Sequence, residues 1–180
     1  PDLEYVMSPA SFKEGTVGLL DKVSGMTLGV WQTRPKSNGY VKINSKNIHE
    51  PPIINPNYLS DPYDVDVLLK SIKIGRNLLS TSPLQPYLNG QANPSNYLQT
   101  DDELLSWARN EGITVYHMIG TAKMGPESDK LAVVNNKLQV RGIESLRVAD
   151  ASIMPTMPSG NTNAPTMMIA EKASDMIIGT

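Results

Sequence analysis

Alternating apolar and polar positions in the first 45 residues predict β-strands. Apolar side chains recur with a two-residue period in Leu3 to Met7 ("LEYVM"), Met26 to Pro35 ("MTLGVWQTRP") and Gly39 to Ser45 ("GYVKINS"), as expected of strands with one buried face. The polar link "KSN" joins the last two segments and leads into Gly39. We therefore expect these two segments to form a hairpin of antiparallel strands.

The pattern then changes from loop to helix. Residues 47–62 ("NIHEPPIINPNYLSDP") are rich in proline, which lacks a backbone N–H and restricts the residue before it, so we expect a connection there. Asp61 and Pro62 match an N-cap and a first helical position. A helix is predicted over roughly residues 62–80, and its apolar face is formed by Val65, Leu68, Leu69, Ile72 and Leu79.

A second helix is predicted in "TDDELLSWARNEG". Thr100 and Glu103 have the spacing of a capping box, and Gly112 stands where a helix C-cap is expected. The segment between the two helices, residues 81–99, is polar and contains several prolines and a glycine, which predicts a loop.

The last third of the chain predicts short strands followed by one helix. Residues 132–140 ("AVVNNKLQV") and 145–152 ("SLRVADAS") are strand-like, and Pro165 suits the first turn of a helix over Ala164 to Ile178. We expect one face of that helix to pack against the rest of the protein, and that face consists of Met168, Ile169, Met176 and Ile177.

Composition excludes several function classes. The 180 residues are 39% hydrophobic, which suits a globular domain with a core. Sixteen basic and eighteen acidic residues give a net charge of -2 without a charged run, so nothing indicates nucleic-acid or lipid binding. With no cysteine and two histidines, no disulfide, thiolate metal site or histidine-rich zinc site is expected. No apolar stretch approaches the ~20 residues of a membrane span.

Two segments carry candidate chemistry. His117 lies in a structured region and its imidazole could exchange a proton near neutral pH, although a structural histidine fits the same pattern. Asn161 and Asn163 lie in "GNTNAPT", directly before a helix whose free amides favour negative charge, where asparagines also act as caps. Asp150 follows a short strand and suits either a cap or an acceptor for sugar-like hydroxyls.

A glycine fingerprint for a dinucleotide is absent: the sequence has neither G-x-G-x-x-G nor a P-loop. The chain also opens on Pro1 without an initiator methionine. We therefore expect it to be a portion of something longer, and most of any cofactor cradle to lie elsewhere.

The segment "YHMIGTAKMGPESDKLAVVNNKLQVRGIESLRVADASIMPTMPSGNTNAPTMMIAEKASDMI" resembles the C-terminal region of the glucose/methanol/choline (GMC) family of FAD-dependent alcohol oxidoreductases. Upstream, "RPKSNGYVKINS", "PIINPNYLSDPYDVDVL" and "DDELLSWAR" are similar to the family's substrate domain. His117 and Asn161 match the family's catalytic pair in its histidine/asparagine variety, as in choline oxidase-like members. Met118 stands where the family usually has proline.

The resemblance implies a mechanism. His117 would take the hydroxyl proton of an alcohol, Asn161 would hold the developing alkoxide, and a hydride would pass to flavin N5, which gives an aldehyde or ketone. The resemblance also implies the residues that contact FAD, which are Tyr116, Asp150, Ala151, Asn163 and Thr166. It does not identify the alcohol, nor whether the enzyme is an oxidase or a dehydrogenase.

The implied fold class is α+β. Residues 1–115 would form an antiparallel substrate-domain sheet flanked by helices. Residues 116–180 would hold the catalytic histidine, then a strand ("SLRVAD") and a helix completing a Rossmann-type FAD domain. We therefore expect the partner to be an N-terminal FAD-binding chain or fragment of the same protein. Absence of cysteine and of glycosylation acceptors favours the cytoplasm, with any targeting signal on that N-terminal part.

Two other readings stay open on the sequence. The first is a lyase of the same family that uses flavin without net redox change, which Asn161 disfavours because those members lack this asparagine. The second is a non-enzymatic binding module in which His117 is a core residue.

Overall fold

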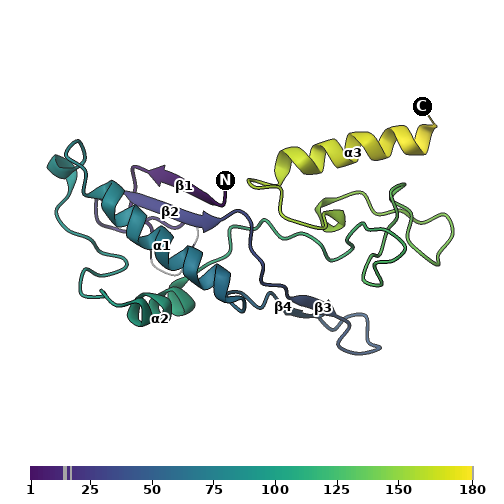
Figure 1. Ribbon diagram of the computed structural model, residues 1–180, viewed down its shortest axis with the longest axis horizontal. Coiled ribbons are helices and arrows are strands. Elements are labelled where there is room, and N and C mark those ends of the chain that lie inside the picture. The colour runs from purple at the N-terminus through teal and green to yellow at the C-terminus, as the bar shows by residue number, and fades with distance from the viewer. Residues whose placement is uncertain (14–15, 17, 180) are drawn as a thin grey trace. The chain divides into compact units, whose positions relative to one another are not determined.

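The computed structural model describes residues 1–13, 16 and 18–179. These residues form an α+β arrangement of short antiparallel sheets and helices (Figure 1). Its elements are β1 (Leu3–Ser8), β2 (Thr27–Gln32), β3 (Tyr40–Lys42), β4 (Ile53–Asn55), α1 (Pro62–Leu79), η1 (Gln85–Tyr87), α2 (Asp101–Glu111), η2 (Ala151–Ile153) and α3 (Asn163–Ile178). Two compact units result: unit 1 is residues 1–32 and 59–115, and unit 2 is residues 33–58 and 116–180.

Unit 1 is a two-stranded sheet with α1 packed against it and α2 packed against α1. β1 and β2 are antiparallel, with Leu3 opposite Gln32 and Ser8 opposite Thr27, and α1 packs across β2 (Figure 1). α1 begins as predicted, because the Asp61 side chain accepts a hydrogen bond from the Tyr63 amide at 2.8 Å.

The buried face of α1 differs from the predicted one. Ile72 is buried, but the other buried positions are mostly small or polar: Asp64, Val67, Ser71 and Gly75. The sheet explains this choice, because the Tyr5 hydroxyl donates to the Ser71 carbonyl at 2.9 Å and Gln32 donates to the Asp64 carboxylate at 3.0 Å. Small residues at this contact let the helix approach the strands closely.

α2 also has the predicted ends. Thr100 and Glu103 form a capping box, and the Gly112 amide donates to the Ala108 carbonyl at the C-cap. The fully buried Leu104 anchors the helix in unit 1. Lys73 of α1 pairs with Asp101 at 2.6 Å, which links the two helices.

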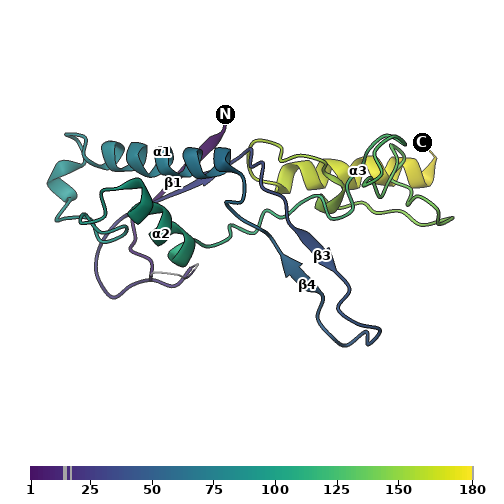
Figure 2. The ribbon, with the colours of Figure 1, turned by 60° about the horizontal axis from the view of Figure 1, so that its bottom comes forward.

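The predicted hairpin in the N-terminal region is wrong. β3 does not pair with residues 26–35; it pairs with β4, with Tyr40 opposite Asn55 and Lys42 opposite Ile53 (Figure 2). β4 lies in the proline-rich stretch that we expected to be a connection. The prolines flank the three strand residues and do not interrupt them, so the ladder keeps its donors.

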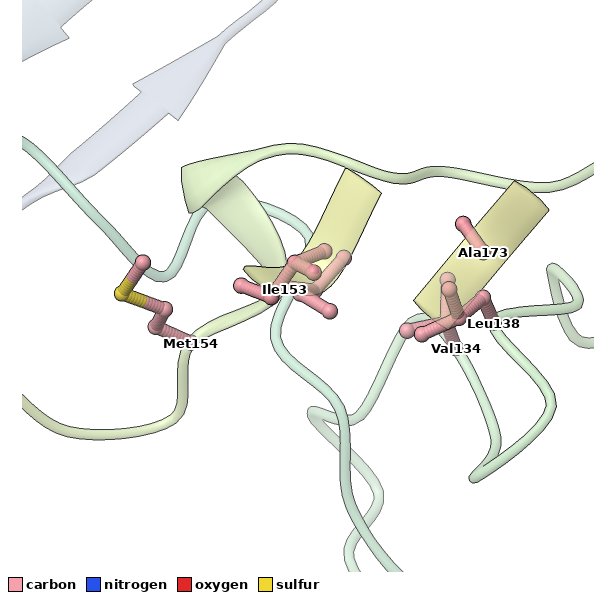
Figure 3. Close-up of a cluster of buried hydrophobic side chains, with 6 residues drawn as sticks. Val134, Leu138, Ile153, Met154 and Ala173 are labelled. Atoms are coloured by element: carbon pink, nitrogen blue, oxygen red, sulfur yellow. The ribbon is translucent and has the colours of Figure 1, made fainter. Parts of the chain in front are cut away.

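Unit 2 has its own hydrophobic core, built from loops, η2 and α3 (Figure 3). The cluster consists of Val134, Leu138, Ile153, Met154, Ile169 and Ala173. Residues 132–140 and 145–152 are not strands in the described structure. They contribute isolated bridges such as Val134 to Val140 and Gln139 to Arg147, because each piece meets its neighbour over a single residue pair.

α3 confirms the predicted helix but only part of the predicted face. Ile169 is 8% exposed and Met176 packs beside it, whereas Met168 and Ile177 are 59% and 63% exposed. Met168 and Ile177 are nine residues apart and therefore lie half a turn from each other around the helix axis. They cannot both belong to one buried face. Among the described residues, no helix combines the length and apolarity that crossing a membrane requires.

Candidate functional site

Every predicted site residue lies in unit 2. The residues belong to three segments, which are the stretch after α2, the turn that begins η2, and the start of α3. In chain order they are Tyr116, His117, Asp150, Ala151, Asn161, Asn163 and Thr166.

The His117 segment is held by its flanking residues. Ile119 packs against the core cluster. Gly120 has φ +83°, and a Cβ there would lie 3.4 Å from the Met154 carbonyl oxygen. Tyr116 also has a positive φ, 61°, and its side chain is 70% exposed. This backbone leaves Tyr116 exposed and His117 partly buried, while Ile119 and Gly120 hold the segment against the core.

Hydrogen bonds tie the same segment to η2. The Ala122 amide donates to the Ser152 carbonyl at 3.0 Å, and the Met124 amide donates to the Ile153 carbonyl at 2.7 Å. Ile153 is only 2% exposed, so this ladder is fixed to the core. The stretch after His117 therefore lies beside the Asp150–Ala151 turn, as a common site would require.

The most direct contact in the site joins His117 to the start of α3. The His117 Nδ1 atom lies 3.0 Å from Thr162 Oγ1, and Thr162 is 8% exposed. Asn161 and Asn163 flank Thr162, and both are exposed. Sequence reasoning assigned roles to both asparagines and missed Thr162, whose hydroxyl between them was the available signal.

The start of α3 offers hydrogen-bond donors. Its N-cap residue, Thr162, makes no side-chain capping bond, and the first turn carries no acidic residue. The backbone amides of Asn163 and Ala164 lie in this first turn, where no carbonyl of the preceding turn can accept from them. With the positive end of the helix dipole, these amides suit an anionic group.

The hydroxyl of Thr166 is already engaged. Its Oγ1 donates to the Thr162 carbonyl at 2.7 Å, and the Thr166 amide donates to the same oxygen at 3.0 Å. Thr166 thus holds Thr162 in place, which is a structural role additional to the flavin contact implied by the resemblance.

The η2 turn provides an acceptor. The Asp150 carboxylate accepts a hydrogen bond from the Ser152 amide at 2.8 Å and caps η2, while the residue stays exposed. A carboxylate can accept several hydrogen bonds, so it retains capacity for ligand hydroxyls. Ala151 begins η2, is partly buried, and packs against the core cluster.

Met118, which replaces the family's usual proline, has a contact of its own. The Tyr58 hydroxyl donates to the Met118 sulfur at 3.6 Å. This contact ties the residue after His117 to the end of residues 33–58 within unit 2.

One charge pair fixes the loop that follows. The Lys123 ammonium lies 2.7 Å from the Asp129 carboxylate. Hydrogen bonds from Lys123 and from the Leu131 amide hold the pKa of Asp129 below its usual value. The pair closes residues 123–129 into a compact turn next to the core residues Ala132 and Val134.

Comparison with known proteins identifies the family of the chain. The family described as GMC oxidoreductase matches residues 35–170. The alcohol dehydrogenase [acceptor] of Pseudomonas putida is 42% identical over 99% of this chain and 32% of its own length. The mitochondrial choline dehydrogenase of Homo sapiens is 38% identical over 99% of this chain and 30% of its own length. The chain therefore spans about a third of the length of these relatives.

A solved structure shows the same fold. The crystal structure of pyridoxine 4-oxidase from Mesorbium loti superimposes with a TM-score of 0.83 at 25% identity, covering 100% of this chain and 35% of that one.

Proposed function

Because the chain belongs to the GMC oxidoreductase family, we propose that it is the C-terminal part of an FAD-dependent alcohol oxidoreductase. The enzyme oxidises the CH–OH group of an alcohol to an aldehyde or ketone. The observation that carries this proposal is the His117–Thr162 contact, because it holds an imidazole at the start of α3, next to Asn161. The relatives' names, alcohol dehydrogenase and choline dehydrogenase, support an alcohol as substrate.

His117 acts as the base in this proposal. Its Nδ1 atom is engaged by Thr162, so Nε2 receives the hydroxyl proton. Asn161 donates a hydrogen bond to the substrate oxygen as negative charge develops there. A base and a donor on one oxygen favour the alkoxide, from which a hydride leaves readily.

The donor set fits FAD. The amides of Asn163 and Ala164 suit the electron-rich pyrimidine edge of the flavin, and Asp150 suits hydroxyls of its ribityl chain. Tyr116, Ala151 and Thr166 would contribute further contacts to FAD. When bound, FAD supplies the hydride acceptor.

The rest of the FAD site lies on a partner segment in this proposal. We assign residues 1–115 to the substrate domain, and residues 116–180 to the catalytic segment and the return into a Rossmann-type FAD domain. Support comes from α3, where Met167 and Ile178 are 56% and 72% exposed. They are eleven residues apart, about three turns, and lie opposite the buried Ile169. A helix that is apolar on two opposite sides packs against other protein segments on both of them.

The test is to purify the complete polypeptide that contains this chain, or the chain coexpressed with the FAD-binding segment. The visible spectrum and the reduction of an electron acceptor by a series of alcohols are then recorded. Flavin bands with alcohol-dependent reduction support the proposal. A folded protein without flavin, or a flavoprotein that no alcohol reduces, contradicts it.

A further inference from the structure

We propose that Thr162 is a positioning residue that selects the tautomer of His117. In this arrangement the His117 Nδ1–H donates to Thr162 Oγ1, which leaves the lone pair of Nε2 as the base. The inference rests on the proposed function for its catalytic consequence, but the hydrogen bond itself can be tested without catalysis.

The first observation is that Thr162 occupies an N-cap position without capping. Threonine at this position normally accepts a hydrogen bond from an amide of the first turn. Here the residue has φ -86° and ψ -7°, which is a helical conformation and not the extended one of a cap, and its side chain makes no capping bond. The hydroxyl is directed instead to His117 Nδ1, 3.0 Å away.

The second observation is that Thr162 is fixed. The residue is 8% exposed, and a buried hydroxyl requires a hydrogen-bond partner. Its carbonyl receives two hydrogen bonds from Thr166, at 2.7 and 3.0 Å. One turn further, the buried Ile169 anchors α3 in the core. The oxygen that faces the imidazole therefore belongs to a well-held element.

The chemistry follows from the two nitrogens of imidazole. A neutral ring carries one N–H and one lone pair, so a base at Nε2 requires the proton at Nδ1. A hydroxyl oxygen within hydrogen-bond distance of Nδ1 accepts that N–H and stabilises this tautomer. Among the described residues, Nε2 of His117 has no hydrogen-bond partner, which is consistent with its role toward substrate.

The direct experiment uses nitrogen NMR of the histidine rings in the 180-residue chain. His49 and His117 are its two histidines, so selective labelling gives two sets of signals, and His49→Gln assigns them. In alkaline buffer, where the rings are neutral, we expect a protonated-type shift for His117 Nδ1 and an unprotonated-type shift for Nε2. Thr162→Ser keeps this pattern. Thr162→Val, of nearly equal shape, shifts it toward a mixture of tautomers.

Control variants separate this effect from general damage. Thr156→Val removes an exposed hydroxyl of the preceding loop and leaves the His117 signals unchanged. An unprotonated-type Nδ1 in the wild type, or the same tautomer in Thr162→Val, overturns the inference.

Steady-state kinetics of the complete flavoprotein are the second test of the role of Thr162. They also test it if a variant of the isolated chain fails to fold. Loss of one neutral hydrogen bond predicts a decrease of about three- to tenfold in kcat for Thr162→Val, with KM nearly unchanged and activity restored in Thr162→Ser. An unchanged kcat overturns the inference and leaves the proposed function standing. Absence of alcohol oxidation in the wild type contradicts the proposed function, while the NMR result still decides the role of Thr162.

Discussion

Ile169 and Ile177 of α3 lie in opposite environments, so the same substitution at these two positions tests the packing of unit 2. Ile169 is 8% exposed and belongs to the core cluster, whereas Ile177 is 63% exposed on the same helix. Both substitutions, Ile169→Ala and Ile177→Ala, remove the same atoms and replace isoleucine by a better helix former.

The expected costs differ because only one side chain leaves a cavity. At Ile169 the lost burial and the cavity beside Ile153 and Ala173 together reduce the free energy of unfolding by about 3 kcal/mol, within the ~2–5 kcal/mol range of such substitutions. At Ile177 the side chain remains mostly in solvent, so the change stays within about 0.5 kcal/mol.

The assay must report on unit 2. Trp31 and Trp107 both lie in unit 1, so tryptophan fluorescence follows the wrong part of the chain. Hydrogen exchange of the α3 amides, read by mass spectrometry, measures the local free energy of opening directly. Equal protection of α3 in the two variants would refute the assignment of its buried face.

Three further predictions follow from local contacts. Thr100→Ala removes the capping box with Glu103 and costs about 1 kcal/mol, measured by urea unfolding followed by tryptophan fluorescence, whereas Thr100→Ser costs much less. The pKa of Asp129 is lower in the folded protein than the aspartate value of about 3.9. Its ionised carboxylate therefore stabilises the fold above that value, and this stabilisation is lost as the pH falls through the folded pKa. In Asp129→Asn we expect the free energy of unfolding to depend less on pH in that range. In Gly39→Ala the new Cβ overlaps the Asn55 carbonyl oxygen, which we expect to lower the stability of unit 2 by about 1–3 kcal/mol. The loss is measured as faster hydrogen exchange of the β3 amides. Gly160→Ala is the control, because a Cβ there meets no atom within 4 Å.

Helix ends were predictable because their signals are local. Asp61 with Pro62, and Thr100 with Glu103, satisfy amides within the next three residues, and the structure confirms both starts. Such bonds depend on a few neighbouring residues and on no distant partner.

Strand pairing was not predictable from the same kind of pattern. β4 is three residues between prolines, and its pairing with β3 depends on backbone contact across an intervening loop. Gly39 was the available signal, because any side chain there would overlap the Asn55 carbonyl. The small residues Ser71 and Gly75 of α1 were missed for a related reason, since hydropathy favours large apolar side chains and close packing favours small ones.

In the candidate site, too, residue type was predictable from the sequence and long-range contacts were not. Residue type and family resemblance identified His117 and Asn161 as candidates, and the structure places both at the start of α3. Thr162 was missed because threonine is common before helices, and its role depends on the orientation of a hydroxyl. Hydrogen-bond partners far apart in sequence require the fold to be known.

The role of His117 as the base in alcohol oxidation can be measured by anaerobic single-turnover reduction of the bound flavin. The rate is compared in the wild type, His117→Ala and His49→Ala, because His49 is the other histidine and lies in an exposed turn. We expect a rate about 10²- to 10⁴-fold lower in His117→Ala, with flavin still bound, and an unchanged rate in His49→Ala. Flavin reduction at the wild-type rate in His117→Ala would contradict this role.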